Sequence, residues 1–189
     1  EQVLIKVHAS SVNPAEWHGV TGEPYLIRLS SGLGAPERVR VGFDYAGTVE
    51  AVGAKVTRFK PGDEVFGGAG GALAEYVLAR ESASIIPKPP QMTFEEAAAV
   101  PIAAITALQA LRDQGRIAAG QKVLINGASG GVGTYAVQIA KAFGAEVTGV
   151  CSTRNVELVR SLGADHVFDY KNEDFTSGTK QYDLIIDNV

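Results

Sequence analysis

Short apolar runs broken by glycine and proline occupy the first half of the chain. The first run begins as a buried apolar segment and then alternates, and the second contains an isolated glycine, which suggests a bulge or a close packing contact. Turn residues such as Pro61 and Gly62 separate the runs. Strands are predicted at 3–9, 44–53, 65–67 and 74–79. Strands at this spacing favour a small β-barrel or sandwich over residues 1–92.

The pattern changes near residues 87–90. Thr93 is a credible helix N-cap with Glu96 three residues later, which is the spacing of a capping box, and an alanine-rich helical segment follows to about residue 114. Apolar strands then alternate with helical segments, which indicates a parallel sheet covered by helices. We predict strands at 122–126, 146–151, 166–169 and 183–187, and helices at 131–143 and 154–162. Residues 93–189 therefore form a second, α/β domain.

Composition excludes several classes of function. The 189 residues are 46% hydrophobic and 20% charged, with a formal net charge of −4, so the chain reads as a globular protein without the basic surface that nucleic acids require. Its one cysteine, Cys151, excludes an internal disulfide and a multi-cysteine zinc site. No apolar stretch reaches the ~18 residues of a membrane span, and no signal peptide opens the chain. We expect a cytoplasmic protein that contacts neither nucleic acid nor membrane.

The turn between the strand at 122–126 and the helix at 131–143 carries the strongest functional signal. It reads Gly127-Ala-Ser-Gly-Gly-Val-Gly133. Small residues let a backbone approach a pyrophosphate, and the N–H groups at the start of the following helix point at its charge. The order strand, glycine turn, helix predicts a nicotinamide dinucleotide site at Gly130, Gly131, Val132 and Gly133. A surface turn without a ligand is the alternative interpretation.

The segment after the next strand indicates which dinucleotide binds. NAD sites usually place an Asp or Glu there to accept the ribose hydroxyls, but no acid occurs from Val147 to Val156. Ser152, Thr153 and Arg154 follow the strand instead. An arginine can grip a 2′-phosphate, which a carboxylate would repel. We therefore predict NADPH as the cofactor. The alternative is that Ser152 and Thr153 only cap the next helix while Arg154 is solvated.

Several ordered motifs together resemble one family, the medium-chain dehydrogenase/reductase superfamily, and within it the zinc-free quinone oxidoreductase branch. The motifs are Ala9–Pro14, Gly42–Gly47, Arg58–Asp63, the turn at Gly127–Gly133 and Leu162–Asp165. The resemblance covers essentially all of the chain. It implies a GroES-like β-barrel domain followed by a partial Rossmann domain with a doubly wound parallel sheet. It also implies further strands before Glu1, a second Rossmann half after Val189, and a homodimer.

The same resemblance implies roles for individual residues. Tyr170 is expected near the adenine-phosphate end of the cofactor, and Thr106 near the nicotinamide ribose. The zinc-dependent branch has metal ligands where this sequence has Asn13, Phe43 and the region of Pro101. Phenylalanine cannot ligate a metal, and the three histidines lack ligand spacing, so we predict no metal.

Without zinc, no Lewis acid polarises a simple ketone or alcohol. An acceptor that is already conjugated, such as a quinone or an α,β-unsaturated carbonyl, then suits a hydride from NADPH, and hydrogen-bond donors suffice for the developing oxyanion. Asn13 and Tyr45 are the candidate catalytic donors, and Asp44 is interpreted as structural. Two alternatives stay open, an NADPH-dependent enoyl-thioester reductase and a truncated, non-catalytic dinucleotide-binding module.

Overall fold

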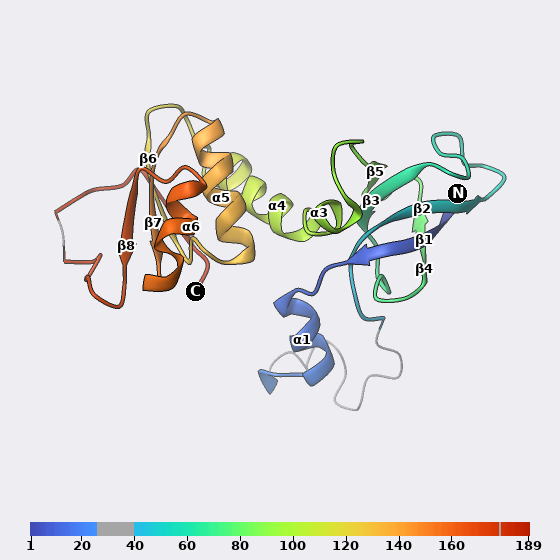
Figure 1. Ribbon diagram of the computed structural model, residues 1–189, viewed down its shortest axis with the longest axis horizontal. Coiled ribbons are helices and arrows are strands. Elements are labelled where there is room, and N and C mark those ends of the chain that lie inside the picture. Colours follow the sequence, from blue (N-terminus) through green and yellow to red (C-terminus); the bar gives the residue numbers. More distant parts are fainter. Residues whose placement is uncertain (26–39, 178) are drawn as a thin grey trace. The chain divides into compact units, whose positions relative to one another are not determined.

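The computed structural model describes residues 1–25, 40–177 and 179–189 (Figure 1). Its contacts divide the chain into two compact units, Glu1–Ile102 and Ala103–Val189. The division falls ten residues after the boundary that the sequence suggests at 92/93, because the helical segment Phe94–Ala98 packs against the strands of the first unit. That domain boundary stays a prediction.

The first unit is built on a five-stranded antiparallel sheet with the order β4-β1-β2-β3-β5. Its strands are β1 (Gln2–Ser10), β2 (Asp44–Val52), β3 (Glu64–Gly68), β4 (Tyr76–Arg80) and β5 (Ile85–Pro87). The register of β1 on β2 shifts twice, between Leu4 and Ile5 and between Val7 and Ala9. Such bulges bend a strand and increase its twist. The four predicted strands are confirmed, and β5 was missed because a three-residue strand carries no readable period.

Alternation along β2 creates two separate apolar clusters in this unit. Tyr45 and Val49 face a core that includes Val3, Ile5 and Val65. A second cluster, on which Phe94 also packs, contains Ala46, Phe66, Ala97 and Ala98. Successive side chains of a strand point to opposite faces, so neighbouring residues of β2 serve different environments.

Four helical segments between residues 14 and 114 differ from the expectation. Helix α1 (Pro14–Thr21) begins after Asn13 and ends at Gly22, which has a φ of 63°. No element was predicted there from the sequence, although Pro at a first helical position and Gly just beyond the end are helix signals. The single helix expected from 93 to 114 is divided into α3 (Phe94–Ala98), α4 (Pro101–Leu108) and a π-helical segment (Gln109–Gln114). Pro101 ends α3 because it has no N–H for a helical hydrogen bond.

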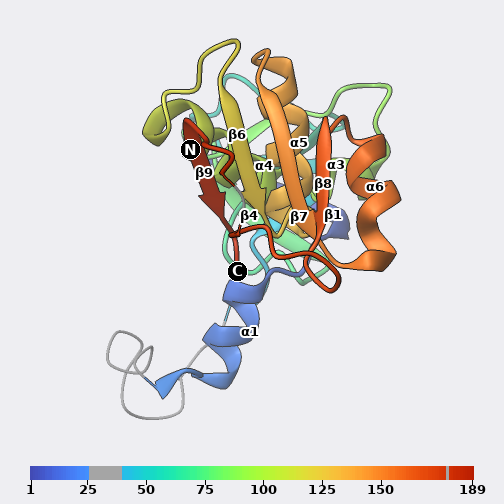
Figure 2. The same ribbon diagram turned by 90° about the vertical axis from the view of Figure 1, so that its left-hand side faces the viewer.

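The second unit contains a four-stranded parallel sheet with the order β8-β7-β6-β9 (Figure 2). Its strands are β6 (Lys122–Asn126), β7 (Glu146–Cys151), β8 (His166–Asp169) and β9 (Leu184–Asp187). Helices α5 (Gly131–Ala142) and α6 (Val156–Ser161) connect them, with a 3₁₀ turn at Thr153–Asn155. These elements match the predicted ones within two residues. The core joins Val123, Ile125 and Val147 of the sheet to one face of α5, formed by Ala136, Val137 and Ala140.

The order of the strands fixes where a ligand site can form. The chain runs from β6 to β7 to β8 in one direction along the sheet and then places β9 on the other side of β6. Ligands of open α/β sheets bind at the carboxyl ends of the strands where the order reverses. In this sheet that point lies beyond Asn126 and Asp187.

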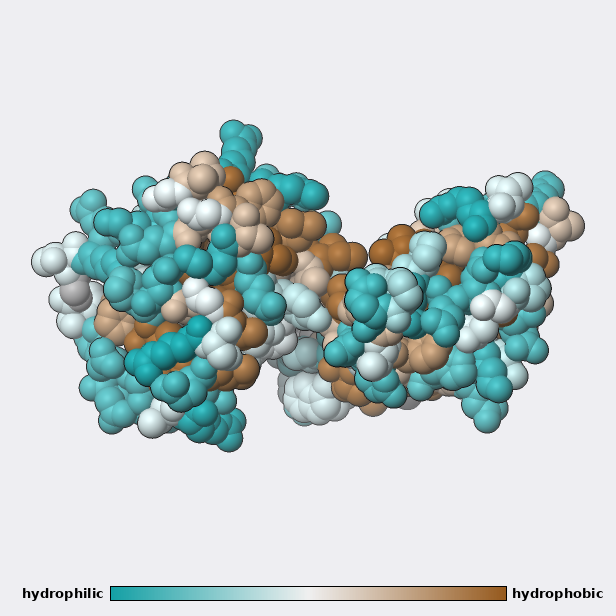
Figure 3. Space-filling view, turned by 45° about the horizontal axis from the view of Figure 1, so that its top comes forward, coloured by the Kyte–Doolittle hydropathy of each residue, from teal (hydrophilic) through white to brown (hydrophobic). Residues whose placement is uncertain are grey.

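On the face drawn in Figure 3, hydrophobic patches lie between hydrophilic side chains. Among the described residues, no helix combines the length and the apolar character that a membrane span needs.

Candidate functional site

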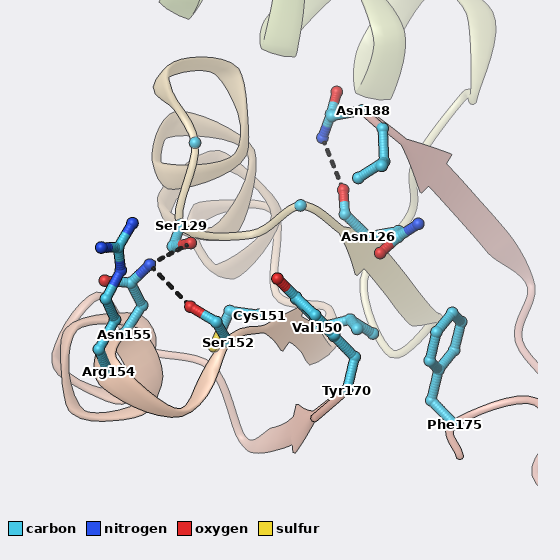
Figure 4. A pocket seen from close by; sticks show the side chains of 13 residues that line it. Asn126, Ser129, Val150, Cys151, Ser152, Arg154, Asn155, Tyr170, Phe175 and Asn188 are labelled. Carbon is cyan, nitrogen blue, oxygen red and sulfur yellow. Dashed lines mark hydrogen bonds between the residues drawn. The ribbon is translucent and has the colours of Figure 1, made fainter. Parts of the chain in front are cut away.

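A cavity of about 660 Å³ opens at the carboxyl ends of the parallel strands. Figure 4 shows its side chains, which come from the ends of β6, β7 and β9 and from the loops that follow β7 and β8. The lining residues are Asn126, Gly127, Ser129, Gly130, Val150, Cys151, Ser152, Arg154, Asn155, Tyr170, Phe175, Asn188 and Val189. Small-molecule and cofactor sites commonly have volumes of ~300–1,000 Å³. The cavity therefore lies where the topology predicts a ligand and has a suitable size.

The glycines of the turn are needed for different structural reasons. Gly127 has a φ of 73°, which favours glycine, and a Cβ on Gly133 would overlap the carbonyl oxygen of Gly127. These two are required by the fold itself. Around Gly131, in contrast, a Cβ would meet no atom within 4 Å. Because no neighbouring atom accounts for Gly131, an approaching ligand is a physical reason for a glycine there.

The first turn of α5 leaves backbone donors available. Its N-cap is Gly130, which has no side chain to cap the N–H groups of Gly131, Val132 and Gly133. The first N–H groups of a helix have no partner within the helix, and they carry its positive dipole end. The residues present fit the phosphates of a dinucleotide, with Gly130 at the cavity wall.

The loop after β7 provides polar groups on another side of the cavity. Ser152 and Arg154 line it, and the amide of Asn155 crosses to the glycine turn. Asn155 Nδ2 donates to Ser129 Oγ at 2.9 Å and to Ser152 Oγ at 3.4 Å (Figure 4). Ser152 occupies the N-cap position of the 3₁₀ turn but makes no capping hydrogen bond through its side chain. Its hydroxyl is therefore directed to Asn155 and the cavity, not to capping.

A smaller hollow of about 380 Å³ adjoins this loop and is lined by Ser152, Thr153, Arg154, Tyr170 and Lys171. Two of these side chains are cationic, and the Lys171 ammonium lies 5.2 Å from the centre of the Tyr170 ring. Among the described residues that line either hollow, none carries a carboxylate side chain. This electrostatic environment suits an anion such as a 2′-phosphate better than two ribose hydroxyls.

Asp169, the residue before Tyr170, carries a carboxylate that is turned into the protein. Asp169 is only 7% exposed. It accepts hydrogen bonds from the backbone N–H of Lys171 at 3.0 Å and from Asn172 Nδ2 at 2.7 Å, and the Thr153 hydroxyl also donates to it. The Thr153 bond is the main reason that the pKa of Asp169 lies below its usual value. Thr153 also lines the smaller hollow, so its contact with the cofactor stays a prediction.

In the first unit, Asn13 belongs to a hydrogen-bond cluster around Asp44, which is 1% exposed. One Asp44 carboxylate oxygen accepts from Ser11 Oγ at 2.7 Å and Asn13 Nδ2 at 3.0 Å, and the other accepts from the backbone N–H of Ile102 at 3.1 Å. Asn13 Nδ2 also donates to Ser11 Oγ at 3.2 Å. These two acceptors lie only 2.7 Å from each other, so they lie on one side of the Asn13 amide nitrogen and share one of its two hydrogens. The role of Asn13 as a catalytic donor stays a prediction, and the interpretation of Asp44 as structural agrees with this geometry.

Tyr45 does not lie beside Asn13. It is fully buried in the cluster on the opposite face of β2 from Asp44, and burial raises the pKa of its hydroxyl. Within the described part of the chain, that hydroxyl has no hydrogen-bond partner. The expected catalytic donation by Tyr45 conflicts with this placement, because strand alternation directs the side chain into the core.

The positions that correspond to metal ligands carry no ligand set. Phe43 is 41% exposed, and no group of three or more His, Cys, Asp or Glu side chains among the described residues is arranged to hold a metal ion. His8 Nε2 pairs with Thr48 Oγ1, and His18 Nδ1 pairs with the carbonyl oxygen of Glu23. His166 faces Glu146 at 3.6 Å.

Thr106 lies exposed on α4 and does not line the cavity of the second unit. Its role near a nicotinamide ribose stays a prediction. Sequence reasoning missed Ser129, Asn155, Asp169 and Lys171. The last two directly flank Tyr170, and the acid at the end of the predicted strand 166–169 is the signal that could have identified Asp169.

Two family models match the chain. The alcohol dehydrogenase GroES-like domain matches residues 1–90, and the model described as zinc-binding dehydrogenase matches residues 131–189. The chain belongs to the medium-chain dehydrogenase/reductase superfamily. Its antiparallel sheet is the GroES-like part of that fold, and its parallel sheet is the Rossmann-like part. The fold class expected from the motifs is thereby confirmed.

Relatives in this superfamily carry several functional names. The chain is 39% identical to the human NAD(P)H oxidoreductase RTN4IP1, mitochondrial, over 100% of this chain and 52% of the relative. It is 40% identical to the trans-enoyl reductase pgmF of Aspergillus terreus, over 100% of this chain and 55% of the relative. The structure of the quinone oxidoreductase from Coxiella burnetii has a TM-score of 0.86 and 37% identity, over 98% of this chain and 59% of that one. The chain thus spans about half the length of the curated relatives it matches.

Proposed function

We propose that this chain is part of an oxidoreductase that uses NADPH to reduce quinones or α,β-unsaturated carbonyls, and that the enzyme does so without zinc. The observation that carries the proposal is the cavity at the strand ends. It joins the uncapped N-terminus of α5 to a cationic hollow that contains Arg154 and no carboxylate side chain among its described lining residues. The relative named an NAD(P)H oxidoreductase supports a nicotinamide cofactor.

Different residues of the chain would bind different parts of this cofactor. The N–H groups at Gly131–Gly133 would hold the pyrophosphate. Arg154 and Ser152 would bind the 2′-phosphate, and Tyr170, which is half exposed, offers an aromatic face near the adenosine. When bound, the cofactor supplies hydride chemistry. The protein's part is to orient it and to fix its phosphates.

The absence of zinc is proposed from the residues at the ligand positions. Asn13 and Phe43 stand where the zinc-dependent branch has ligands, and Asn13 is already committed to Asp44. A phenyl ring cannot replace a ligand. Reduction without a Lewis acid favours an acceptor whose carbonyl is conjugated, which supports quinones and enones as the substrate class. The relative named a quinone oxidoreductase has the same fold.

Two further functions are kept as alternatives. An enoyl-thioester reductase is favoured by the 40% identity to a trans-enoyl reductase. A dinucleotide-binding module without turnover would have the same cavity, because every residue proposed to hold the phosphates lies in the second unit. The homodimer and the cytoplasmic location stay predictions.

The test measures cofactor binding and turnover of this chain. We expect saturable binding of NADPH, followed by nicotinamide fluorescence, with weaker binding of NADH. Arg154→Ala should lower NADPH affinity by about tenfold and leave NADH affinity nearly unchanged, because a charge-assisted bond to the 2′-phosphate is lost. Arg160→Ala is the matched control, since Arg160 is an exposed arginine of α6 paired with Glu157 and does not line the cavity.

Loss of absorbance by the reduced nicotinamide is then measured with a panel of quinones, enones and enoyl thioesters. Turnover of quinones or enones supports the proposed reaction, and turnover of enoyl thioesters alone supports the first alternative. NADPH binding without any turnover supports the module. Equal affinity of wild-type chain for NADPH and NADH would contradict the proposed cofactor preference.

A further inference from the structure

Two loops form the cationic hollow beside the main cavity. Arg154 comes from the loop after β7, and Lys171 comes from the turn after β8. Both cations line one hollow only while the two loops keep their positions. A side chain that bonds to both loops would act as a tie between them.

Asp169 supplies that tie. It is the last residue of β8, and Cys151, the last residue of β7, pairs with it in the parallel register. Its buried carboxylate receives the Thr153 hydroxyl from one loop and the backbone N–H of Lys171 from the other. The side chain of Asn172 adds a further bond at 2.7 Å. The Asp169 carboxylate thus bonds to Thr153, the residue before Arg154, and to Asn172, the residue after Lys171.

We infer that Asp169 is a positioning residue that holds Arg154 and Lys171 on two sides of one hollow, and so sets the preference of the site for a ligand with a 2′-phosphate. This inference rests on the proposed NADPH preference. It also makes Lys171 a second cation for that phosphate. Asp169 itself is not expected to contact the ligand, because its oxygens are occupied by protein donors and it does not line either hollow.

The inference predicts that the affinity for the 2′-phosphate changes in the opposite direction from the one that simple electrostatics predicts when Asp169 is neutralised. Removing a negative charge near an anion site should by itself strengthen anion binding. If Asp169 acts by holding the loops, Asp169→Asn instead weakens binding of the 2′-phosphate, because an amide cannot accept from both loops as the carboxylate does. The direction of the change therefore separates the two accounts.

The experiment compares binding of 2′,5′-ADP and 5′-AMP to the wild-type chain and its variants by calorimetry. Asp169→Asn is expected to lower affinity for 2′,5′-ADP by about five- to tenfold and to change affinity for 5′-AMP by less than about twofold. Lys171→Gln should also lower the affinity for 2′,5′-ADP selectively. Thr153→Val should resemble Asp169→Asn, and the double variant should lose little more than either single variant, because both remove the same tie.

Asp165→Asn is the matched control. Asp165 also joins two elements of this unit, through Lys141 Nζ at 2.8 Å and the backbone N–H of Val147 at 2.7 Å, but it precedes β8, at the end of the sheet away from the hollow. It should lower the melting temperature and keep the ratio of the two affinities. Stronger binding of 2′,5′-ADP by Asp169→Asn, or an equal loss for both nucleotides, would overturn the inference. Equal binding of both nucleotides by wild-type chain would overturn the NADPH preference itself.

Discussion

Asn155 reaches across the cavity to Ser129, with its Nδ2 atom 2.9 Å from the serine Oγ. This bond joins the loop after β7 to the glycine turn that follows β6, although the two residues are 26 positions apart in sequence. The hydrogen bond therefore holds together the two segments that are proposed to bind the adenosine ribose and the pyrophosphate.

Asn155→Ala should loosen that link. We expect NADPH affinity to fall several-fold and the free energy of unfolding to fall by about 1 kcal/mol, because hydrogen bonds to two serines are lost. Fluorescence titration and urea unfolding measure the two effects. Gln138→Ala removes an exposed amide on α5 that donates to the Thr134 carbonyl oxygen of the same helix, and it should leave NADPH affinity unchanged. An unchanged affinity in Asn155→Ala would refute the link.

The two glycines Gly131 and Gly133 should respond in opposite ways to alanine. A Cβ at 133 would overlap the Gly127 carbonyl oxygen, so Gly133→Ala is expected to destabilise the chain by about 1–3 kcal/mol. A Cβ at 131 meets nothing, so Gly131→Ala should keep stability or raise it by up to about 1 kcal/mol while weakening NADPH binding more than tenfold. Thermal unfolding and cofactor titration of both variants test this. Normal NADPH binding by Gly131→Ala would mean that no phosphate approaches that backbone.

Tyr45→Phe distinguishes a core tyrosine from a catalytic one. The hydroxyl is buried without a partner among the described residues, and removing an unsatisfied buried group costs nothing or stabilises the fold, by up to about 1 kcal/mol. We expect equal or higher resistance to urea and an unchanged reduction rate. A rate reduced tenfold or more would restore the catalytic interpretation.

The stability that Asp169 contributes should depend on pH with a defined sign. Because its pKa in the folded chain lies below the usual 3.8, mainly through the Thr153 hydroxyl, its contribution is complete above the unfolded value and is lost as pH falls through the folded value. The difference in unfolding free energy between wild type and Asp169→Asn should be constant above about pH 5 and shrink at lower pH. Urea titrations from neutral to acidic pH measure it. A difference that is independent of pH would exclude the carboxylate as its source.

Local patterns were sufficient for the parallel sheet and for helices α5 and α6. The apolar run at 122–126, the glycine turn and the amphipathic segment after it predicted β6 and α5 almost to the residue, because each element repeats its own period over enough residues. The same approach missed α1 and β5, where helix signals at Pro14 and Gly22 surround a segment without an apolar stripe, and where three residues show no period.

The sequence by itself determined the family, the fold class, the glycine turn and the lack of an acid after β7, since all of these are properties of consecutive residues. Only the tertiary structure decided which side chains meet. It directed Tyr45 into the core, joined the Asn13 amide to Asp44 and Ser11, and placed Asp169 between the loops of Arg154 and Lys171. The reason is physical: strand alternation and parallel pairing bring together residues that no spacing along the chain relates.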